Sequence, residues 1–318
     1  MSRVFYYHGV GGALPYFQNN LRFGQRRLHN ACTHSGVESN PRSLRPKSRI
    51  ILKFSYKHRT NTGVNNLLSR IQNMHATLRP TFVTLTWRSA FKDESLWIRI
   101  GKTIQNEFEI ECLMHLTCHL PVSDLKRVLK NCREAGLRNI LALRGDPPIG
   151  QERWKKREGC LNNAMELVQL IRKEHGDYFC IAVAGYPESH IETWNSPHLP
   201  PSEQCRKLDV SRLKGKMDAG ADFIITQFFF DVKMYLAYRE RCRKLGIHAP
   251  ILPGYLPIQN YKSYKKFTKW CKTHVPTNVV EDLEKIKDND QAVKAYVSLS
   301  LSLVPNSNSN TFKHTRNT

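Results

Sequence analysis

The sequence predicts an α/β protein whose main domain is a (βα)8 TIM barrel, and three observations lead to this fold class. Short apolar runs alternate with longer amphipathic stretches from about residue 50 onward. The apolar runs are nearly continuous, which is typical of parallel strands buried on both faces, and the amphipathic stretches are typical of helices that cover such a sheet. Seven strand–helix repeats are recognisable, one fewer than a closed barrel contains. An open doubly wound sheet is the alternative architecture.

Each predicted strand is followed by a predicted helix, in order along the chain. The strands are rich in β-branched and apolar residues, and the helices carry apolar residues at every third or fourth position. We expect strands over 50–56, 82–87, 110–118, 137–145, 180–186, 221–230 and 251–256. We expect helices over 62–74, 93–106, 121–135, 160–175, 203–219, 231–245, 260–273 and 280–302.

Capping residues mark two of the helix boundaries. Ser123 and Asp124 open the helix expected over 121–135, and Gly136 follows its end. These are the residue types that helix starts and ends prefer. Gly220 ends another helix, and an apolar strand follows at once. Both boundaries support the strand–helix alternation.

The two ends of the chain differ from its middle. Residues 1–48 mix glycines, prolines and arginines with a single acid, Glu38, and we expect a disordered basic leader. After Tyr296 the sequence becomes low in complexity, and no eighth strand is recognisable there. The predicted organisation is therefore a leader over 1–48, a βα-barrel domain over 49–302 and a low-complexity tail over 303–318.

The charge of the chain is unusual, because 49 basic and 27 acidic side chains give a net charge of +22. Residues 1–92 hold 15 of the basic side chains and one acid, a net charge of 15 − 1 = +14. A basic segment can bind nucleic acid, but no nucleic-acid module is recognisable, so we do not expect a nucleic-acid partner. No apolar run approaches the ~20 residues that span a bilayer, so we expect no membrane association. Nine cysteines without a CxxC pair indicate a reducing compartment.

Polar residues stand at the carboxyl ends of five predicted strands, where barrels place their active sites. Arg144 could bind a phosphate or a flavin carbonyl and Asp146 a polar ring, with a structural ion pair as the alternative. Gly145 between them would let backbone approach a ligand. The strand-end residues are Thr86, Trp87, His115, Arg144, Gly145, Asp146, Tyr186 and Gln227.

We expect no metal site. Cys112 and Cys118 would face one side of their strand, and His115 and His119 the other, so the four ligand types cannot converge. His115 alone is either a hydrogen-bond donor in a pocket or a satisfied core histidine. The motifs GxGxxG, GxxxxGK[ST] and GxSxG are all absent. Their absence argues, respectively, against a Rossmann dinucleotide site, a P-loop nucleotide site and the nucleophile elbow of an α/β-hydrolase.

A series of motifs from about residue 59 to 297 resembles the catalytic domain of methylenetetrahydrofolate reductases. The motifs occur in the family's order on the predicted βα frame, which makes the resemblance specific. They include 84–87 (TLTW), 113–118 (LMHLTC), 139–147 (NILALRGDP), 183–187 (VAGYP), 219–230 (AGADFIITQFFF) and 287–290 (KDND).

The resemblance implies a flavoprotein that takes a hydride from NADPH or NADH onto FAD and reduces 5,10-methylenetetrahydrofolate to 5-methyltetrahydrofolate. It implies a cytoplasmic place in one-carbon metabolism and methionine supply, with a mitochondrial address as the alternative because of the arginine-bearing leader. A homo-oligomer is compatible with it. The implied FAD contacts are Thr86, Trp87, His115, Arg144, Gly145, Asp146, Ala164, Tyr186, His190, Asp209 and Lys216.

The implied substrate contacts are fewer. Asp146 and Gln227 would bind the folate pterin, and Phe267 would stack on nicotinamide or folate. Asp146 would also be catalytic, because a carboxylate near the folate could stabilise the cationic iminium form that accepts hydride.

The chain departs from the family pattern in three respects. The family's first strand carries a glutamate that acts as general acid, and here Phe54 stands at its position, or Lys53 with a shift of one residue. The family's eighth strand and its regulatory domain that binds S-adenosylmethionine have no counterpart after Val297. A catalytically impaired or inactive flavin-binding relative, a truncated or mis-joined gene model, and a basic binding protein on a reused barrel are therefore alternatives.

Overall fold

The fold is described from a computed structural model. It describes residues 5–8, 50–55, 60–86, 94–145, 157–190, 206–254, 258, 260–271 and 273–302. The predicted site residues Trp87 and Asp146, and the tail over 303–318, lie outside these ranges.

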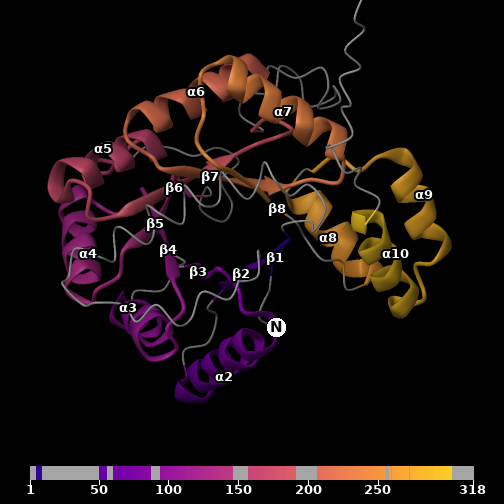
Figure 1. Ribbon diagram of the computed structural model, residues 1–318, viewed down its shortest axis with the longest axis horizontal. Helices are drawn as coiled ribbons and strands as arrows, with labels where there is room; N and C mark the ends of the chain where they lie inside the picture. Colours follow the sequence, from indigo (N-terminus) through magenta and orange to yellow (C-terminus); the bar gives the residue numbers. More distant parts are fainter. Residues whose placement is uncertain are drawn as a thin grey trace, which may run out of the picture.

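Eight strands form one sheet in the order in which they occur in the chain. The sheet curls into a partial barrel with the helices outside it (Figure 1), so the predicted barrel-type α/β class is confirmed. The seven predicted strands are all present, and each pairs in parallel with the next. They are β2 (Ile50–Ser55), β3 (Phe82–Thr86), β4 (Cys112–Thr117), β5 (Asn139–Leu143), β6 (Cys180–Gly185), β7 (Phe223–Phe228) and β8 (Ile251–Gly254).

The eighth strand, β1 (Phe5–His8), precedes the seven instead of following them. It pairs antiparallel with β2, from Phe5 opposite Lys53 to His8 opposite Ile50. It also contacts β8, so it lies between the first and last parallel strands of the barrel. The sequence analysis placed these four residues within the leader, and the rest of the leader lies outside the described residues.

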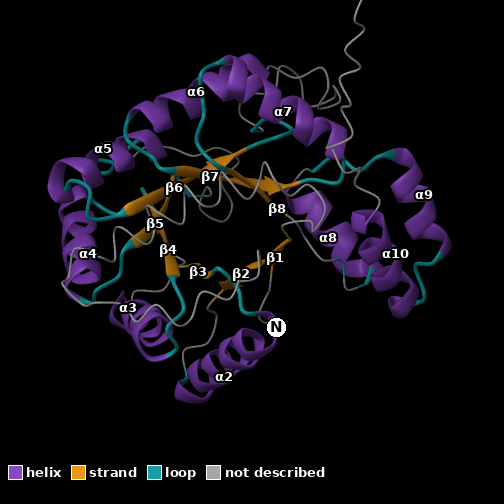
Figure 2. Cartoon of the chain, in the orientation of Figure 1, coloured by secondary structure: helices purple, strands orange, loops and turns teal. Residues whose placement is uncertain are grey.

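Most of the helices lie on the outer surface of the sheet, and the last three pack against one another beside it (Figure 2). The helices are α2 (Asn61–Leu78), α3 (Glu94–Lys102), α4 (Val122–Glu134), α5 (Ala164–His175), α6 (Arg206–Asp218), α7 (Val232–Lys244), α8 (Tyr261–Cys271), α9 (Thr277–Lys285) and α10 (Asp290–Ser302). Thr103–Glu107 continues α3 as a single π-helical segment. No helix in the described part of the chain is long and apolar enough to cross a bilayer.

The prediction of one helix over 280–302 is wrong, because two helices occupy this stretch. The backbone turns at 286–289, where the N–H of Asn289 donates to the carbonyl of Ile286. The Asn289 side chain then accepts hydrogen bonds from the N–H groups of Gln291 and Ala292. Asparagine favours this N-capping role over a helix interior, so a new helix begins here.

Alternate residues of each strand face two different cores. On β4, Cys112 and Met114 face the helices, whereas Leu113 faces the barrel interior with Phe82 and Phe223. Because side chains alternate along a strand, His115 shares the inner face with Leu113. The inner face therefore places the polar strand-end residues around the barrel axis.

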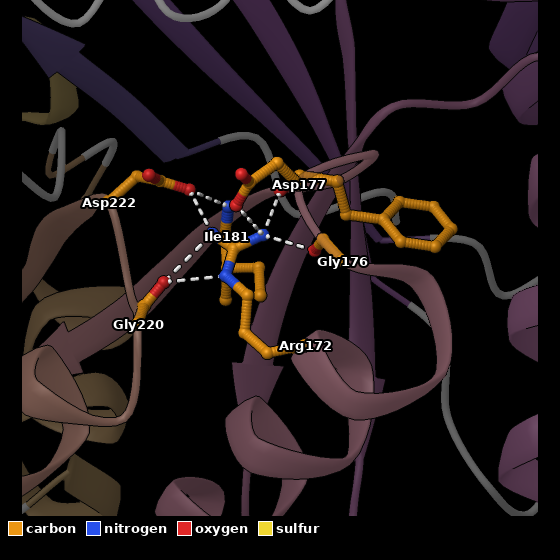
Figure 3. A network of polar contacts seen from close by, with 7 residues as sticks. Arg172, Gly176, Asp177, Ile181, Gly220 and Asp222 are labelled. Carbon is orange, nitrogen blue, oxygen red and sulfur yellow. Dashed lines mark hydrogen bonds and ion pairs between the residues drawn. The ribbon is translucent and has the colours of Figure 1, made fainter.

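A polar network around Arg172 joins α5 to β6 and β7 at the end of the barrel opposite these strand ends (Figure 3). The guanidinium donates to the carbonyls of Gly220 at 2.8 Å and Phe179 at 2.7 Å. It also pairs with the buried carboxylate of Asp222 at 2.7 Å. The same carboxylate accepts the N–H of Ile181 at 2.8 Å. This network fixes the starts of β6 and β7.

Candidate functional site

Thr86 and His115 meet at the carboxyl ends of β3 and β4. Thr86 Oγ1 lies 3.3 Å from His115 Nδ1, within hydrogen-bond distance. The His115 ring is buried, with 2% of its surface exposed. The structure therefore brings together two of the residues predicted for the site, and both point into the barrel.

The next strand end brings Arg144 and Gly145 beside His119. Gly145 has φ +96°, and a Cβ at this position would lie 2.0 Å from the His119 ring. Only glycine permits this conformation and this close approach. Nearby, the Cys118 thiol donates to the carbonyl of Asn163, the residue that caps α5, at 3.1 Å. The start of α5, which carries Ala164, is thereby attached to the end of β4.

Tyr186, His190, Asp209 and Lys216 converge after β6. The rings of Tyr186 and His190 meet edge to face at 4.8 Å between centroids. Lys216 Nζ donates to the carbonyl of Ala184 at 2.6 Å and lies 5.9 Å from the centre of the Tyr186 ring. The backbone N–H of His190 donates to the carboxylate of Asp209, which is 7% exposed. All four residues were predicted for one site, and the structure places them together.

Burial changes the protonation of the two charged members of this cluster. It raises the pKa of Asp209 to about 6, although Lys216 and the His190 N–H oppose the rise. It lowers the pKa of Lys216 to about 8, against the opposing effect of Asp209. At neutral pH this pair therefore carries one negative and one positive charge.

Gln227 lies on β7, the strand that pairs with β6, and Phe267 lies on α8. Gln227 is the exposed residue in an otherwise buried β7, and the pairing of β7 with β8 shifts register between Ile225 and Phe228. Such a bulge redirects a side chain. Phe267 lies half-buried on α8. Both side chains are therefore at least partly exposed.

The register of β2 distinguishes the two residues at the family's glutamate position. Lys53 stands opposite Thr84, and Phe54 stands opposite Leu85. Leu85 belongs to the core under the helices, and Thr84 lies on the other face of β3. Thr84 Oγ1 is buried and has no hydrogen-bond partner among the described residues.

The described residues contain no group of three or more His, Cys, Asp or Glu that could hold a metal ion. The polar groups present fit a different kind of ligand, a flat ring system with polar edges. Tyr186 and His190 offer aromatic faces, and Arg144 and Lys216 offer cationic donors. The donor set therefore fits such a ring system better than a metal ion.

One buried residue of this region was missed in the sequence analysis. Glu188 follows Tyr186 by two residues and is 8% exposed. An acid so close to a strand end is visible in the sequence, but its burial depends on contacts with a segment far along the chain. Its surroundings are described below.

The model of the family "Methylenetetrahydrofolate reductase" matches residues 45–310. "Methylenetetrahydrofolate reductase (NADH) 1" of Arabidopsis thaliana is 42% identical over 239 residues, which cover 75% of this chain and 40% of that protein. "Methylenetetrahydrofolate reductase 2" of Schizosaccharomyces pombe is 35% identical, over 78% of this chain and 39% of that protein.

The name of a third relative gives NADPH instead of NADH. "Probable methylenetetrahydrofolate reductase (NADPH)" of Caenorhabditis elegans is 32% identical, over 84% of this chain and 39% of that protein. The chain thus spans about 40% of the length of the curated relatives it matches.

Proposed function

The chain belongs to the methylenetetrahydrofolate reductase family, and from this premise we propose that it binds FAD and reduces 5,10-methylenetetrahydrofolate to 5-methyltetrahydrofolate with NADH or NADPH. The observation that carries the proposal is the convergence of four residues after β6. Tyr186, His190, Asp209 and Lys216 lie together, and the resemblance assigns all four to FAD.

FAD, when bound, would accept a hydride from the nicotinamide and deliver it to the folate. The residues of the chain would hold and orient the reactants. Lys216 and Arg144 would place positive charge beside the polar atoms of the flavin, and Thr86 and His115 would donate or accept hydrogen bonds from the inner face.

The folate would lie between the strand ends and α8. Gln227 and Asp146 would bind the polar edge of the pterin, since an amide and a carboxylate both form paired hydrogen bonds with such an edge. Phe267 would stack on a flat ring of the folate or the nicotinamide. Following the family, the reaction would take place in the cytoplasm and supply methyl groups for methionine.

A second candidate function is a flavin-binding relative that is impaired in the folate step. The residues at the family's glutamate position favour it, because neither Lys53 nor Phe54 is a carboxylic acid. Loss of a general acid typically slows a reaction by ~10²–10⁴-fold. Hydride transfer from nicotinamide to flavin does not need this acid and would persist.

The test is the visible absorption spectrum of the purified chain, followed by anaerobic addition of NADH or NADPH. We expect flavin bands that bleach with either nicotinamide and return on addition of 5,10-methylenetetrahydrofolate. Bleaching without return would favour the second candidate. A colourless chain that takes up no added FAD would overturn both.

A matched pair of variants makes the test specific to the proposed site. Lys216→Met removes the cation beside Tyr186, and we expect it to lower the FAD content of the purified protein. Lys214→Met removes a lysine of the same helix that pairs with Asp218, and we expect normal FAD content.

A further inference from the structure

Glu188 joins two parts of the barrel mouth that are far apart in the chain. Its Oε2 accepts the backbone N–H of His274 at 2.8 Å. Its Oε1 is buried and has no hydrogen-bond partner among the described residues. A carboxyl group in such a place is unusual, because burying one is costly unless it is paired or protonated.

The residues on both sides of this contact belong to the proposed site. Glu188 lies between Tyr186 and His190 on the β6 loop. His274 lies just after α8, and the N–H of the preceding Thr273 donates to the carbonyl of Thr268 at 3.1 Å. The segment that Glu188 holds is therefore attached to the last turn of α8, the helix that carries Phe267.

Two charged side chains, besides the backbone N–H of His274, act on the carboxyl group. Asp231, which caps the start of α7, and Arg206, in the first turn of α6, act on it in opposite directions. His274 itself lies in the segment after α8. Burial, with a smaller contribution from Asp231, raises the pKa of Glu188 from 4.5 to about 8. At neutral pH the group is therefore a neutral carboxylic acid.

We propose that Glu188 is a positioning residue, which holds the end of α8, and with it Phe267, in place relative to Tyr186 and His190. The expected effect of Glu188 on catalysis rests on the proposed function. The contact between Glu188 and His274 does not, and it can be measured without any enzyme activity. When the contact opens, the α8 end loses its attachment to the flavin side of the site.

Amide hydrogen exchange of residues 273–276 tests the contact directly. Glu188→Ala removes the acceptor, so we expect exchange of the His274 amide about tenfold faster. Glu188→Gln retains a side-chain oxygen, and its exchange should remain close to that of the wild type. Glu158→Ala, at an exposed acid elsewhere on the chain, is the control.

The pH dependence of this exchange provides a second test. An exposed Glu188 has its ordinary pKa of 4.5, and the buried one titrates near 8. Glu188 binds its proton more tightly when its contact with His274 is formed than when the contact is open. The contact is therefore most stable below pH 4.5 and becomes weaker as the pH rises to about 8. After correction for intrinsic exchange, opening should increase by up to tenfold per pH unit in this window. Glu188→Gln should abolish that slope, although it retains His274, Asp231 and Arg206.

Steady-state kinetics separate a positioning role from a purely structural one. We expect Glu188→Ala to retain its FAD and to raise the KM for the nicotinamide or the folate by about tenfold, because a small displacement of a stacking residue weakens binding. Unchanged exchange at His274 would overturn the proposal, and so would faster exchange with unchanged KM and kcat. If the wild-type chain binds no FAD, the proposed function fails, and hydrogen exchange alone decides whether Glu188 holds α8.

Discussion

Asp209 and Lys216 give the candidate site one charge of each sign over a limited pH range. Asp209 is ionised above about pH 6, and Lys216 is protonated below about pH 8. We predict that FAD binds most tightly between these values. Affinity should fall as pH decreases through 6, because Asp209 becomes neutral, and as pH increases through 8, because Lys216 loses its charge. FAD titrations across a pH series, followed by flavin fluorescence, measure this profile.

Single substitutions identify the two limbs of that profile. Asp209→Asn should remove the acid limb, and Lys216→Met should remove the alkaline limb. Lys214→Met, on the same helix, should leave both limbs in place. An acid limb that persists in Asp209→Asn would show that another group is responsible.

Position 53 is the second test at the scale of single residues. Lys53 stands opposite the buried Thr84, whose hydroxyl has no partner among the described residues. We predict that Lys53→Glu raises the rate of folate reduction by ~10²-fold or more, because it supplies a general acid opposite Thr84, at a candidate for the family's glutamate position. Rapid-reaction spectroscopy of the two half-reactions measures it, and the rate of flavin reduction by nicotinamide should not change.

Phe54→Glu is the matched control, since position 54 stands opposite Leu85 in the core under the helices. It should reduce stability and give no gain in folate reduction. A gain from Phe54→Glu and none from Lys53→Glu would show that Phe54, and not Lys53, stands at the family's glutamate position.

The positions of individual site residues could be predicted from the sequence where the periodicity of a strand determines them. The contact between Thr86 and His115 follows from two neighbouring parallel strands that end at the same edge. The contact between Glu188 and His274 could not be predicted, because it joins residues 86 positions apart through loop backbone. The roles of all the predicted site residues stay predictions, and Trp87 and Asp146 also lie outside the described residues.

At the scale of elements, Arg172 joins one helix to two strands. It donates to the carbonyls of Phe179 and Gly220 and pairs with Asp222, whose side chain is 8% exposed (Figure 3). We predict that Arg172→Met lowers the free energy of unfolding by about 3–5 kcal/mol, because it leaves a buried carboxylate without its partner. Urea denaturation followed by circular dichroism measures the change.

A surface ion pair on the neighbouring helices provides the comparison. Lys126 pairs with Glu174 at 2.9 Å, and the lysine side chain is 47% exposed. Lys126→Met should change the free energy of unfolding by less than about 1 kcal/mol. Equal losses in the two variants would mean that the Arg172 network is no more stabilising than a solvent-exposed pair.

Most elements could be predicted, because long amphipathic and continuous apolar runs have few alternative structures. The strands β3 to β8 illustrate this, since most of their residues are apolar and buried. The division of the stretch 280–302 was missed because the run Asp288, Asn289 and Asp290 can lie either on the exposed face of a helix or at a helix start. Only the side-chain bonds of Asn289 to the next turn reveal that a helix begins there.

At the scale of the whole molecule, closure of the barrel depends on a segment that the sequence pattern did not identify. A strand of four residues, FYYH, carries too little periodicity to be recognised within a glycine-rich stretch. Its place in the sheet is determined by pairing with β2, a long-range contact. The sequence therefore predicted the order of the seven parallel strands but not what covers the edge of the first.

This edge leads to a prediction about the whole chain. β1 pairs with the outer edge of β2 and contacts β8, so removal of residues 1–12 would leave unpaired N–H and C=O groups on β2. Exposed strand edges pair with other chains. We predict that the shortened chain self-associates at concentrations where the full chain does not, and that light scattering after gel filtration detects it.

Proline substitutions separate the loss of pairing from the loss of the segment. Tyr6 and Tyr7 stand opposite Leu52 and Ile51. In an antiparallel pair successive N–H groups point to opposite sides, so only one of the two bonds β2. Proline at that position removes a ladder hydrogen bond, whereas proline at the other leaves the ladder intact. The variant whose proline removes the ladder hydrogen bond should therefore self-associate like the shortened chain. The variant whose proline leaves the ladder intact should behave like the full chain. If the shortened chain has the same mass as the full chain across the concentration series, β1 does not protect the edge of the barrel.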